Sequence, residues 1–143
     1  MFIGEFQHNI DPKGRLAVPA KFRADLSHGA VVTRGLDGCL FVYPMTEWQQ
    51  LADKLKSLPL TQADARAFVR LMFSGAAEVE IDKQGRINIP AYLLKYAGIA
   101  KETVVAGLFN RIEIWGADSW QTYKDKAEKE SDTIAEQLGA LGI

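Results

Sequence analysis

Two arginines with the same neighbours are the residues of this chain best suited to bind a charged ligand. Arg15 follows Asp11 by four residues, and Arg86 follows Asp82 by four residues. The planar guanidinium of arginine can donate paired hydrogen bonds both to phosphate oxygens and to the O6/N7 edge of guanine. The duplicated Asp-x-x-x-Arg spacing therefore indicates a nucleic-acid interface that uses two arginines.

Further basic side chains lie close to these arginines in the sequence. Lys13 and Lys83 fall inside the same two segments, while Lys21 and Arg23 follow the first segment. Such side chains would contact backbone phosphates, which position a protein on DNA without specifying bases. Alternatively, each of these four side chains could simply be solvated at the surface and contact no ligand. Residues 11–23 carry four cations against one carboxylate, so we expect a basic face here.

The same Asp–Arg pairs allow two other interpretations. Each arginine could simply neutralise the aspartate of its own segment, although an exposed pair of this kind contributes only ~0–1 kcal/mol. Alternatively, Asp11 and Asp82 could be paired catalytic carboxylates as in aspartic proteases, which need a hydroxyl residue and then glycine after each aspartate. Pro-Lys and Lys-Gln follow here instead, and the nearby cations would lower both carboxyl pKa values rather than allow a shared proton. We therefore expect a protein that is not an enzyme.

The residues around each arginine have the chemistry of a tight turn. An aspartate at the first position, Asp11 or Asp82, accepts backbone N–H groups, and Pro12 presets φ in the first copy. Gly14 and Gly85 supply a permissive backbone at the fourth position. These residues are predicted to shape the turns, so that each arginine lies where the chain leaves a turn and enters a strand.

The two segments belong to an internal repeat. A shift of 71 residues aligns eight identical residues within nineteen positions, and a shift of 72 then aligns Trp48 with Trp120. Because such a repeat is a structural unit, we expect a single compact domain made of two copies. Its predicted parts are repeat 1 (1–58), a helical linker (59–72), repeat 2 (73–130) and a flexible acidic tail (131–143).

Hydrophobic periodicity and turn signals predict the same order of elements in both repeats: strand, turn, strand, short helix, hairpin and helix. In repeat 1 the strands are 5–10, 15–18, 30–34 and 39–43, and the short helix is 19–26. In repeat 2 the strands are 77–81, 86–89, 103–106 and 111–115. The predicted N-caps of three longer helices are Thr46, Thr61 and Asp118.

A sheet unit of this size cannot bury both of its faces, and it leaves backbone N–H and C=O groups unpaired at its edges. Two units can close on each other and share one core, which predicts a mainly β fold with helices, arranged as a pseudo-twofold β-barrel. The two arginine-bearing turns would then occupy equivalent places about the axis, as in a homodimer fused into one polypeptide.

Composition excludes several classes of protein. Apolar residues make up 48% of the 143, enough for a core, and a single cysteine rules out an internal disulfide or a multi-cysteine zinc site. We expect no metal and no cofactor. No apolar run approaches the ~18 residues of a membrane span, and the first residues lack the pattern of an export signal, so a cytoplasmic protein is expected. The net charge of −1 hides an asymmetry, because residues 1–111 carry a net +3 and residues 112–143 a net −4.

The duplicated motif and its surroundings resemble the MraZ family, within the AbrB-like group of swapped-hairpin barrels. The resemblance rests on Met1-Phe2, Gly4, Asp11–Arg15 and Pro19, and on Phe73, Gly75, Asp82–Arg86 and Pro90. It implies two tandem AbrB-like repeats, and a nucleoid-associated transcriptional regulator that binds short direct repeats upstream of the bacterial division and cell-wall gene cluster. It also implies repression of that cluster, including the protein's own gene, and a homo-oligomeric ring that presents these turns on one rim.

A function of another class stays open at the level of sequence. An oligomeric protein-interaction scaffold of the same barrel fold could use the basic turns to meet an acidic partner. For the DNA-binding alternative, specific affinities of ~10⁻⁸ M or better usually need more contacts than one subunit with a few signature cations offers. We therefore expect several subunits to act together on double-stranded DNA.

Overall fold

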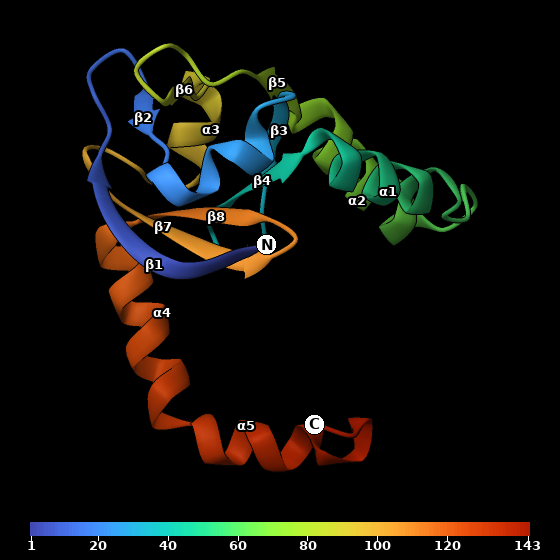
Figure 1. Cartoon of the computed structure of the whole chain (residues 1–143). Coiled ribbons are helices and arrows are strands. Elements are labelled where there is room, and N and C mark those ends of the chain that lie inside the picture. Colours follow the sequence, from blue (N-terminus) through green and yellow to red (C-terminus); the bar gives the residue numbers. More distant parts are fainter.

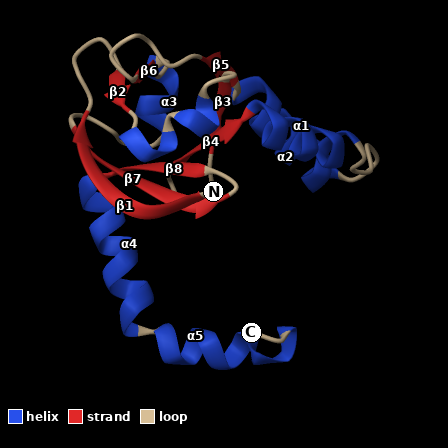
Figure 2. Cartoon of the chain, viewed as in Figure 1, coloured by secondary structure: helices blue, strands red, loops and turns tan.

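The computed structural model describes residues 1–143 and contains two antiparallel sheets with helices around them (Figures 1 and 2). The large sheet has the spatial order β1 (Phe2–Asn9), β7 (Glu102–Phe109), β8 (Ile112–Gly116), β4 (Leu40–Pro44), β3 (Ala30–Arg34) and β5 (Ala77–Val79). The small sheet is a two-stranded ribbon of β2 (Arg15–Ala17) and β6 (Arg86–Asn88). The α-helices are α1 (Met45–Lys56), α2 (Ala63–Gly75), α3 (Ala91–Tyr96), α4 (Ala117–Lys129) and α5 (Ser131–Leu138). The 3₁₀ segments are η1 (Ala20–Phe22), η2 (Ala24–Leu26) and η3 (Gly139–Leu141).

Strands of the first half pair repeatedly with strands of the second half. In the ribbon β2–β6, Leu16 lies opposite Ile87, and in the large sheet Phe41 of β4 lies opposite Glu113 of β8. The first register is unchanged when the halves are exchanged with a shift of 71, and the second when they are exchanged with a shift of 72. At the two edges, β1 pairs with β7 and β5 pairs with β3. Neither half could therefore complete its sheet contacts alone.

The ribbon, η1, η2 and α3 cover one face of the large sheet, and α1, α2 and α4 cover the other. Leu16 and Ile87 point inward from the ribbon into a core of 19 buried residues that includes Val42, Val105 and Ile114. Full burial of one such side chain stabilises the fold by ~1.5–3 kcal/mol. On the opposite face a second cluster packs under the helices, with its buried members at Cys39, Phe41, Tyr43, Leu55, Met72, Val104 and Trp115.

The structure is a mixed fold of β-strands and helices, and the predicted closed barrel does not form. The six-stranded sheet is open, with β1 and β5 at its edges. The reason lies in the short strands β2 and β6, which pair with each other instead of bridging those edges. They close the core as a separate layer rather than as staves of one barrel.

The three predicted helix caps are wrong. The residues that precede α1, α2 and α4 are Pro44, Gln62 and Gly116, and none makes a side-chain cap hydrogen bond. For α1 and α4 the cause is that the chain passes directly from the last residue of β4 or β8 into the helix. The predicted caps Thr46 and Asp118 therefore fall inside the first turn, and Thr61 lies two residues before α2.

Two other segments differ from the expectation. The predicted helix at 19–26 is a pair of 3₁₀ turns, η1 and η2, whereas its counterpart in the second half is the α-helix α3. The segment predicted as a tail contains α5 and η3, which Figure 1 shows standing away from both sheets. The hairpin predicted from the strands at 30–34 and 39–43 is present, with β3 and β4 as its arms.

Two glycines tie the ribbon together. The carbonyl of Gly14 accepts the N–H of Ile89 at 2.8 Å, and the carbonyl of Gly85 accepts the N–H of Val18 at 2.9 Å. Gly14 has a φ of +81°, and a Cβ placed on it would lie 2.8 Å from the carbonyl oxygen of Ile89. Gly38 also has a positive φ, +84°, but no atom lies within 4 Å of a Cβ there.

Substitution of Gly14 and of Gly38 distinguishes the cost of backbone strain from the cost of close packing. Gly38→Ala should cost ~1–2 kcal/mol for the left-handed backbone alone. Gly14→Ala should cost a further ~1–3 kcal/mol, because its methyl group meets a backbone carbonyl that cannot move without breaking the ribbon. Urea unfolding of both variants measures the difference. Equal losses would show that the approach of the two halves at Gly14 does not constrain the fold.

Candidate nucleic-acid interface

Asp11–Arg15 (turn 1) and Asp82–Arg86 (turn 2) fold into the same network of hydrogen bonds. In turn 1, Oδ1 of Asp11 accepts the backbone N–H of Lys13 at 2.9 Å and of Arg15 at 2.8 Å. In turn 2, Oδ1 of Asp82 accepts the N–H groups two and four residues later, both at 2.9 Å. In both turns the fourth residue is glycine in the left-handed region and donates its N–H to the aspartate carbonyl at 3.0 Å. The aspartates and glycines therefore have the turn-shaping contacts that the sequence predicts for them.

Each aspartate also holds one edge of its arginine. Nε of Arg15 donates to Oδ2 of Asp11 at 2.6 Å, and Nε of Arg86 donates to Oδ2 of Asp82 at 3.0 Å. The arginine side chains are 34% and 27% exposed. Their terminal Nη atoms make no hydrogen bond within the chain. The pairing thus fixes the direction of each guanidinium and leaves its outer donors available.

The electrostatics of the turns favour ionised aspartates. The pKa of Asp11 is lowered from its usual value chiefly by the backbone N–H of Arg15, with further contributions from the Arg15 side chain and the N–H of Lys13. The pKa of Asp82 is lowered in the same way by Arg86 and by the N–H of Gln84. Each carboxylate is bonded within its own turn. This arrangement does not supply the proton shared between two aspartates that a catalytic pair requires.

The ribbon brings the two arginines onto one surface. Side chains alternate along each strand, so Leu16 and Ile87 point into the core while Arg15, Arg86 and Asn88 point outward. Arg15 lies opposite Asn88, and Arg86 lies opposite Ala17. The arginines are therefore diagonal neighbours on adjacent strands, a placement in which the two residues are ~7–8 Å apart. Asn88 was not predicted as a site residue, although the alternation of the strand at 86–89 was the signal that could have found it.

Three of the four remaining predicted cations lie at the ribbon or its turns. Lys13 and Lys83 are exposed in turns 1 and 2 and form no ion pair. Arg23 donates from Nε to the carbonyl of Val18 at 2.9 Å, and its guanidinium occupies the space that a Cβ on Gly85 would need. A cation from the first half is therefore packed against turn 2, which has glutamine where turn 1 has Lys13.

Lys21 lies elsewhere. Its ammonium is 5.0 Å from the ring centroid of Phe6 and 5.8 Å from that of Phe22, so it rests over the middle of β1. A cation over aromatic rings is stabilised by ~0.5–1 kcal/mol at an exposed site. The predicted cluster of six cations is thus five around the ribbon and one beside β1.

The chain holds no group of three or more His, Cys, Asp or Glu side chains that could bind a metal ion. No helix is both long enough and apolar enough to cross a membrane. The lone thiol, Cys39, is fully buried, and burial raises its pKa to about 12. Its chemistry is that of a small core residue.

The lowered aspartate pKa values predict a pH dependence of stability. A carboxyl whose pKa is depressed by folding contributes stability above its unfolded pKa, ~3.9, and loses that contribution as pH falls through the folded pKa. Asp11→Asn should therefore be less stable than the native chain near pH 7, and this difference should shrink progressively below pH ~4. Urea unfolding of both proteins at a series of pH values measures it. A difference that is the same at pH 7 and at pH 2 would mean that the charge of Asp11 does not stabilise turn 1.

Known proteins match this chain along its whole length. The model of the family described as MraZ protein, antitoxin-like, matches residues 1–71 and again residues 72–140. "Transcriptional regulator MraZ" of Pelotomaculum thermopropionicum is 56% identical over 143 residues, which are 100% of this chain and 99% of the relative. The protein of the same name from Desulforamulus reducens is 58% identical over 138 residues, 96% of this chain and 97% of the relative. That from Halothermothrix orenii is 56% identical over 143 residues, 100% of both chains. The chain belongs to the MraZ family.

Proposed function

We propose that this chain is a sequence-specific DNA-binding transcription regulator, and that it contacts DNA with the outward face of the ribbon β2–β6 and with turns 1 and 2. The observation that carries the proposal is the state of Arg15 and Arg86. Each is held at Nε by an aspartate while its Nη donors are unused. A fixed guanidinium loses little conformational freedom on binding. The relatives' shared name, transcriptional regulator, agrees with this function.

The shape of the ribbon suits the major groove of DNA. That groove is ~12 Å wide and admits a two-stranded β-ribbon. Arginine donates two hydrogen bonds to O6 and N7 of guanine, and asparagine pairs in a similar way with adenine. Arg15, Arg86 and Asn88 would read bases, while Lys13, Lys83 and Arg23 would meet phosphates and set the register. Lys21 lies over the ring of Phe6 in β1 and not at the ribbon. It is therefore proposed only as a peripheral phosphate contact.

We further propose that the two halves are related by a pseudo-twofold axis that passes through the ribbon. Support comes from the register of β2 and β6, in which exchange of the halves with a shift of 71 reproduces every pair. The two arginines would then approach DNA in equivalent ways. Turn 2 lacks the lysine that turn 1 has at its third position, but Lys83 and Arg23 supply positive charge beside it.

The finer parts of the proposal rest on the resemblance of the duplicated motif. In this view the protein assembles as a ring, binds short direct repeats upstream of the division and cell-wall gene cluster, and represses that cluster together with its own gene. It would act in the cytoplasm at the nucleoid. One subunit offers five cations around the ribbon, so several subunits on successive repeats would raise the affinity through effective concentration.

Substitution of the arginines tests the base contacts. Arg15→Ala should abolish most specific binding, because loss of a bidentate base contact costs ~1–3 kcal/mol per site and the loss recurs in every subunit. Its cost in stability should stay within the ~0–1 kcal/mol of an exposed ion pair. Gel shift with a duplex from the chain's own upstream region, together with thermal melting, measures both quantities. Arg86→Ala should weaken binding in the same direction.

Two controls sharpen this test. Arg15→Lys keeps the charge but loses the planar fork, so it should lose specific binding while it keeps nonspecific retention on heparin. Lys54→Ala removes an exposed cation of α1 far from the ribbon and should leave binding unchanged. If Arg15→Ala binds the duplex as the native chain does, the base-reading role is wrong. If the native chain is retained on heparin but does not distinguish operator from competitor DNA, an acidic protein partner becomes the better explanation.

Salt dependence tests the phosphate contacts. The logarithm of the binding constant should fall linearly with the logarithm of salt concentration, with a slope of about −0.9 per phosphate neutralised. Lys13→Ala and Lys83→Ala should each reduce the magnitude of this slope by about one and weaken binding evenly across sequences. Fluorescence anisotropy titrations at several salt concentrations give the slopes. An unchanged slope in both variants would remove these lysines from the interface.

A further inference from the structure

The helix α5 is an apolar and acidic arm without a partner. None of its residues is buried, and Ile134 and Leu138 continue into Leu141 of η3 as one apolar stripe, with exposures of 39%, 39% and 75%. Residues 130–143 hold three carboxylates and no lysine or arginine. Figure 1 shows α4 leading away from the sheet and α5 turned across its end, in open space.

This arm cannot fold back on the helix before it. In the first half, six residues separate α1 from α2, and α2 packs against α1, which buries Ala52 and Leu55. In the second half, only Glu130 separates α4 from α5, and α4 buries no residue. Two antiparallel helices need a connection of at least about two residues. Ile134, next to the bend, lies in a shallow hollow with Tyr123 and Ala127 of α4. The rest of the apolar stripe has no cover from α4.

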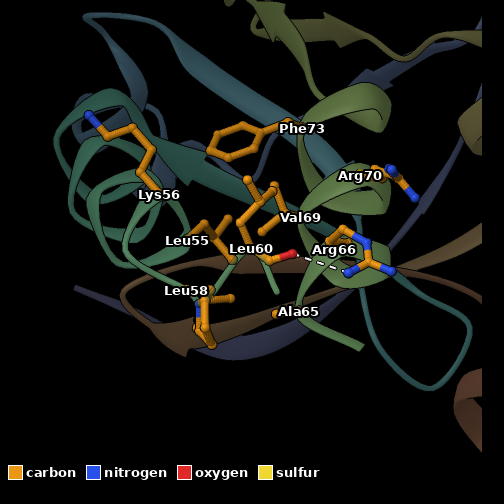
Figure 3. Close-up of a pocket in the computed structure, with 10 residues that line it drawn as sticks. Leu55, Lys56, Leu58, Leu60, Ala65, Arg66, Val69, Arg70 and Phe73 are labelled. Atoms are coloured by element: carbon orange, nitrogen blue, oxygen red, sulfur yellow. Dashed lines mark hydrogen bonds between the residues drawn. The ribbon is translucent and has the colours of Figure 1, made fainter. Parts of the chain in front are cut away.

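A pocket between α1 and α2 has the complementary character. It has a volume of about 340 Å³ and is lined mainly by apolar side chains, among them Leu55, Leu60, Val69 and Phe73 (Figure 3). A cavity of ~150 Å³ is large enough for one benzene molecule, so this pocket has room for more than one aliphatic side chain. Leu60 at its lip is 79% exposed.

The charges of the pocket are opposite to those of the arm. Lys56 from α1 and Arg66 and Arg70 from α2 line it, and no carboxylate does. Lys56 is paired with Asp53 of its own helix at 3.2 Å. Arg66 donates to the carbonyl of Leu60 at 3.1 Å, and neither arginine forms an ion pair within the chain. Three uncompensated carboxylates on the arm would be attracted to these two arginines at low and moderate salt.

We infer that the pocket between α1 and α2 receives α5 of a second copy of this chain. Leu138 and Leu141 enter the apolar floor, and the acidic arm approaches the basic rim. The arm and the pocket lie on separate parts of the molecule (Figure 1), so each copy offers both surfaces. Such a head-to-tail contact leads to a closed ring or an open filament. The inference rests on the proposed homo-oligomer and assigns its surfaces, but it does not depend on DNA.

Single aspartates on either surface test the contact. Leu138→Asp places a charge in the apolar stripe, and Leu60→Asp places one at the lip of the pocket. Because Leu60 is highly exposed, its substitution should not destabilise the fold. Both should shift the mass of the full chain in light scattering from a multiple of 15.8 kDa toward 15.8 kDa. Thr133→Asp adds the same charge to α5 away from the stripe, and Thr61→Asp does so next to Leu60. These two controls should keep the native mass.

Cross-linking identifies the pair of surfaces directly. A mixture of Leu138→Cys and Val69→Cys chains should form a mixed disulfide-linked dimer under mild oxidation, whereas Thr133→Cys with Val69→Cys should not. The buried Cys39, with its pKa raised to about 12, gives little background. Native mass in both aspartate variants, a monomeric native chain, or no more mixed dimer than the Thr133→Cys control gives would each overturn the inference.

A parallel gel shift tests the proposed regulator function independently of the docking of α5. If the native chain binds its upstream duplex while both aspartate variants keep the native mass, the docking of α5 is wrong and the regulator stands. If the aspartate variants dissociate while the native chain ignores the duplex, the regulator is wrong and the docking stands.

Discussion

The exchange of backbone hydrogen bonds between the two halves is the constraint on which the rest of the structure depends. Gly14 and Gly85 each present a carbonyl to the strand end of the other half, and β2 and β6 have no pairing partner except each other. The ribbon is only three residues long on each side. Such a short pair is not stable by itself in water, so its stability comes from Leu16 and Ile87 in the shared core.

This constraint explains why the Asp–Arg pairs need not stabilise the fold. Asp11 and Asp82 already satisfy three backbone donors of their turns, which shapes the backbone before the arginine side chain contributes. The ion pair is partly exposed and adds little energy. The ion pair instead fixes the orientation of the guanidinium, which is held at its Nε edge and points away from the core. The glycines and apolar residues hold the turns and the ribbon, and the proposed contact with DNA falls to the arginines directly beside them.

The sequence predicted the turns, the repeat and most strands because these depend on local chemistry and on short-range alternation. Asp, Gly and Pro at fixed offsets specify a turn whatever surrounds it. The closed barrel was wrong because the order of strands depends on which edges meet, a long-range choice between pairings of similar local quality. Two of the three helix caps were wrong because β4 and β8 run directly into α1 and α4, so that each helix begins before the residue predicted to cap it. The alternation of the strand at 86–89 already places Asn88 on the outward face, but its position opposite Arg15 depends on the pairing of β2 with β6.

The two halves match at the ribbon and differ at their helical ends. At the ribbon, equal residues in equal registers give two similar turns, which suits two similar contacts to one ligand. At the helical ends, a six-residue connection lets α2 fold onto α1 and create a basic, apolar pocket, while a one-residue connection makes α5 leave the body as an acidic, apolar arm. If the helical ends of both halves were alike, the chain would have two basic pockets or two acidic arms. Two copies of such a chain would meet with like charges. In the inferred docking, the different lengths of these two connections give each copy one arm and one pocket, which is the requirement for contacts that repeat in one direction from copy to copy.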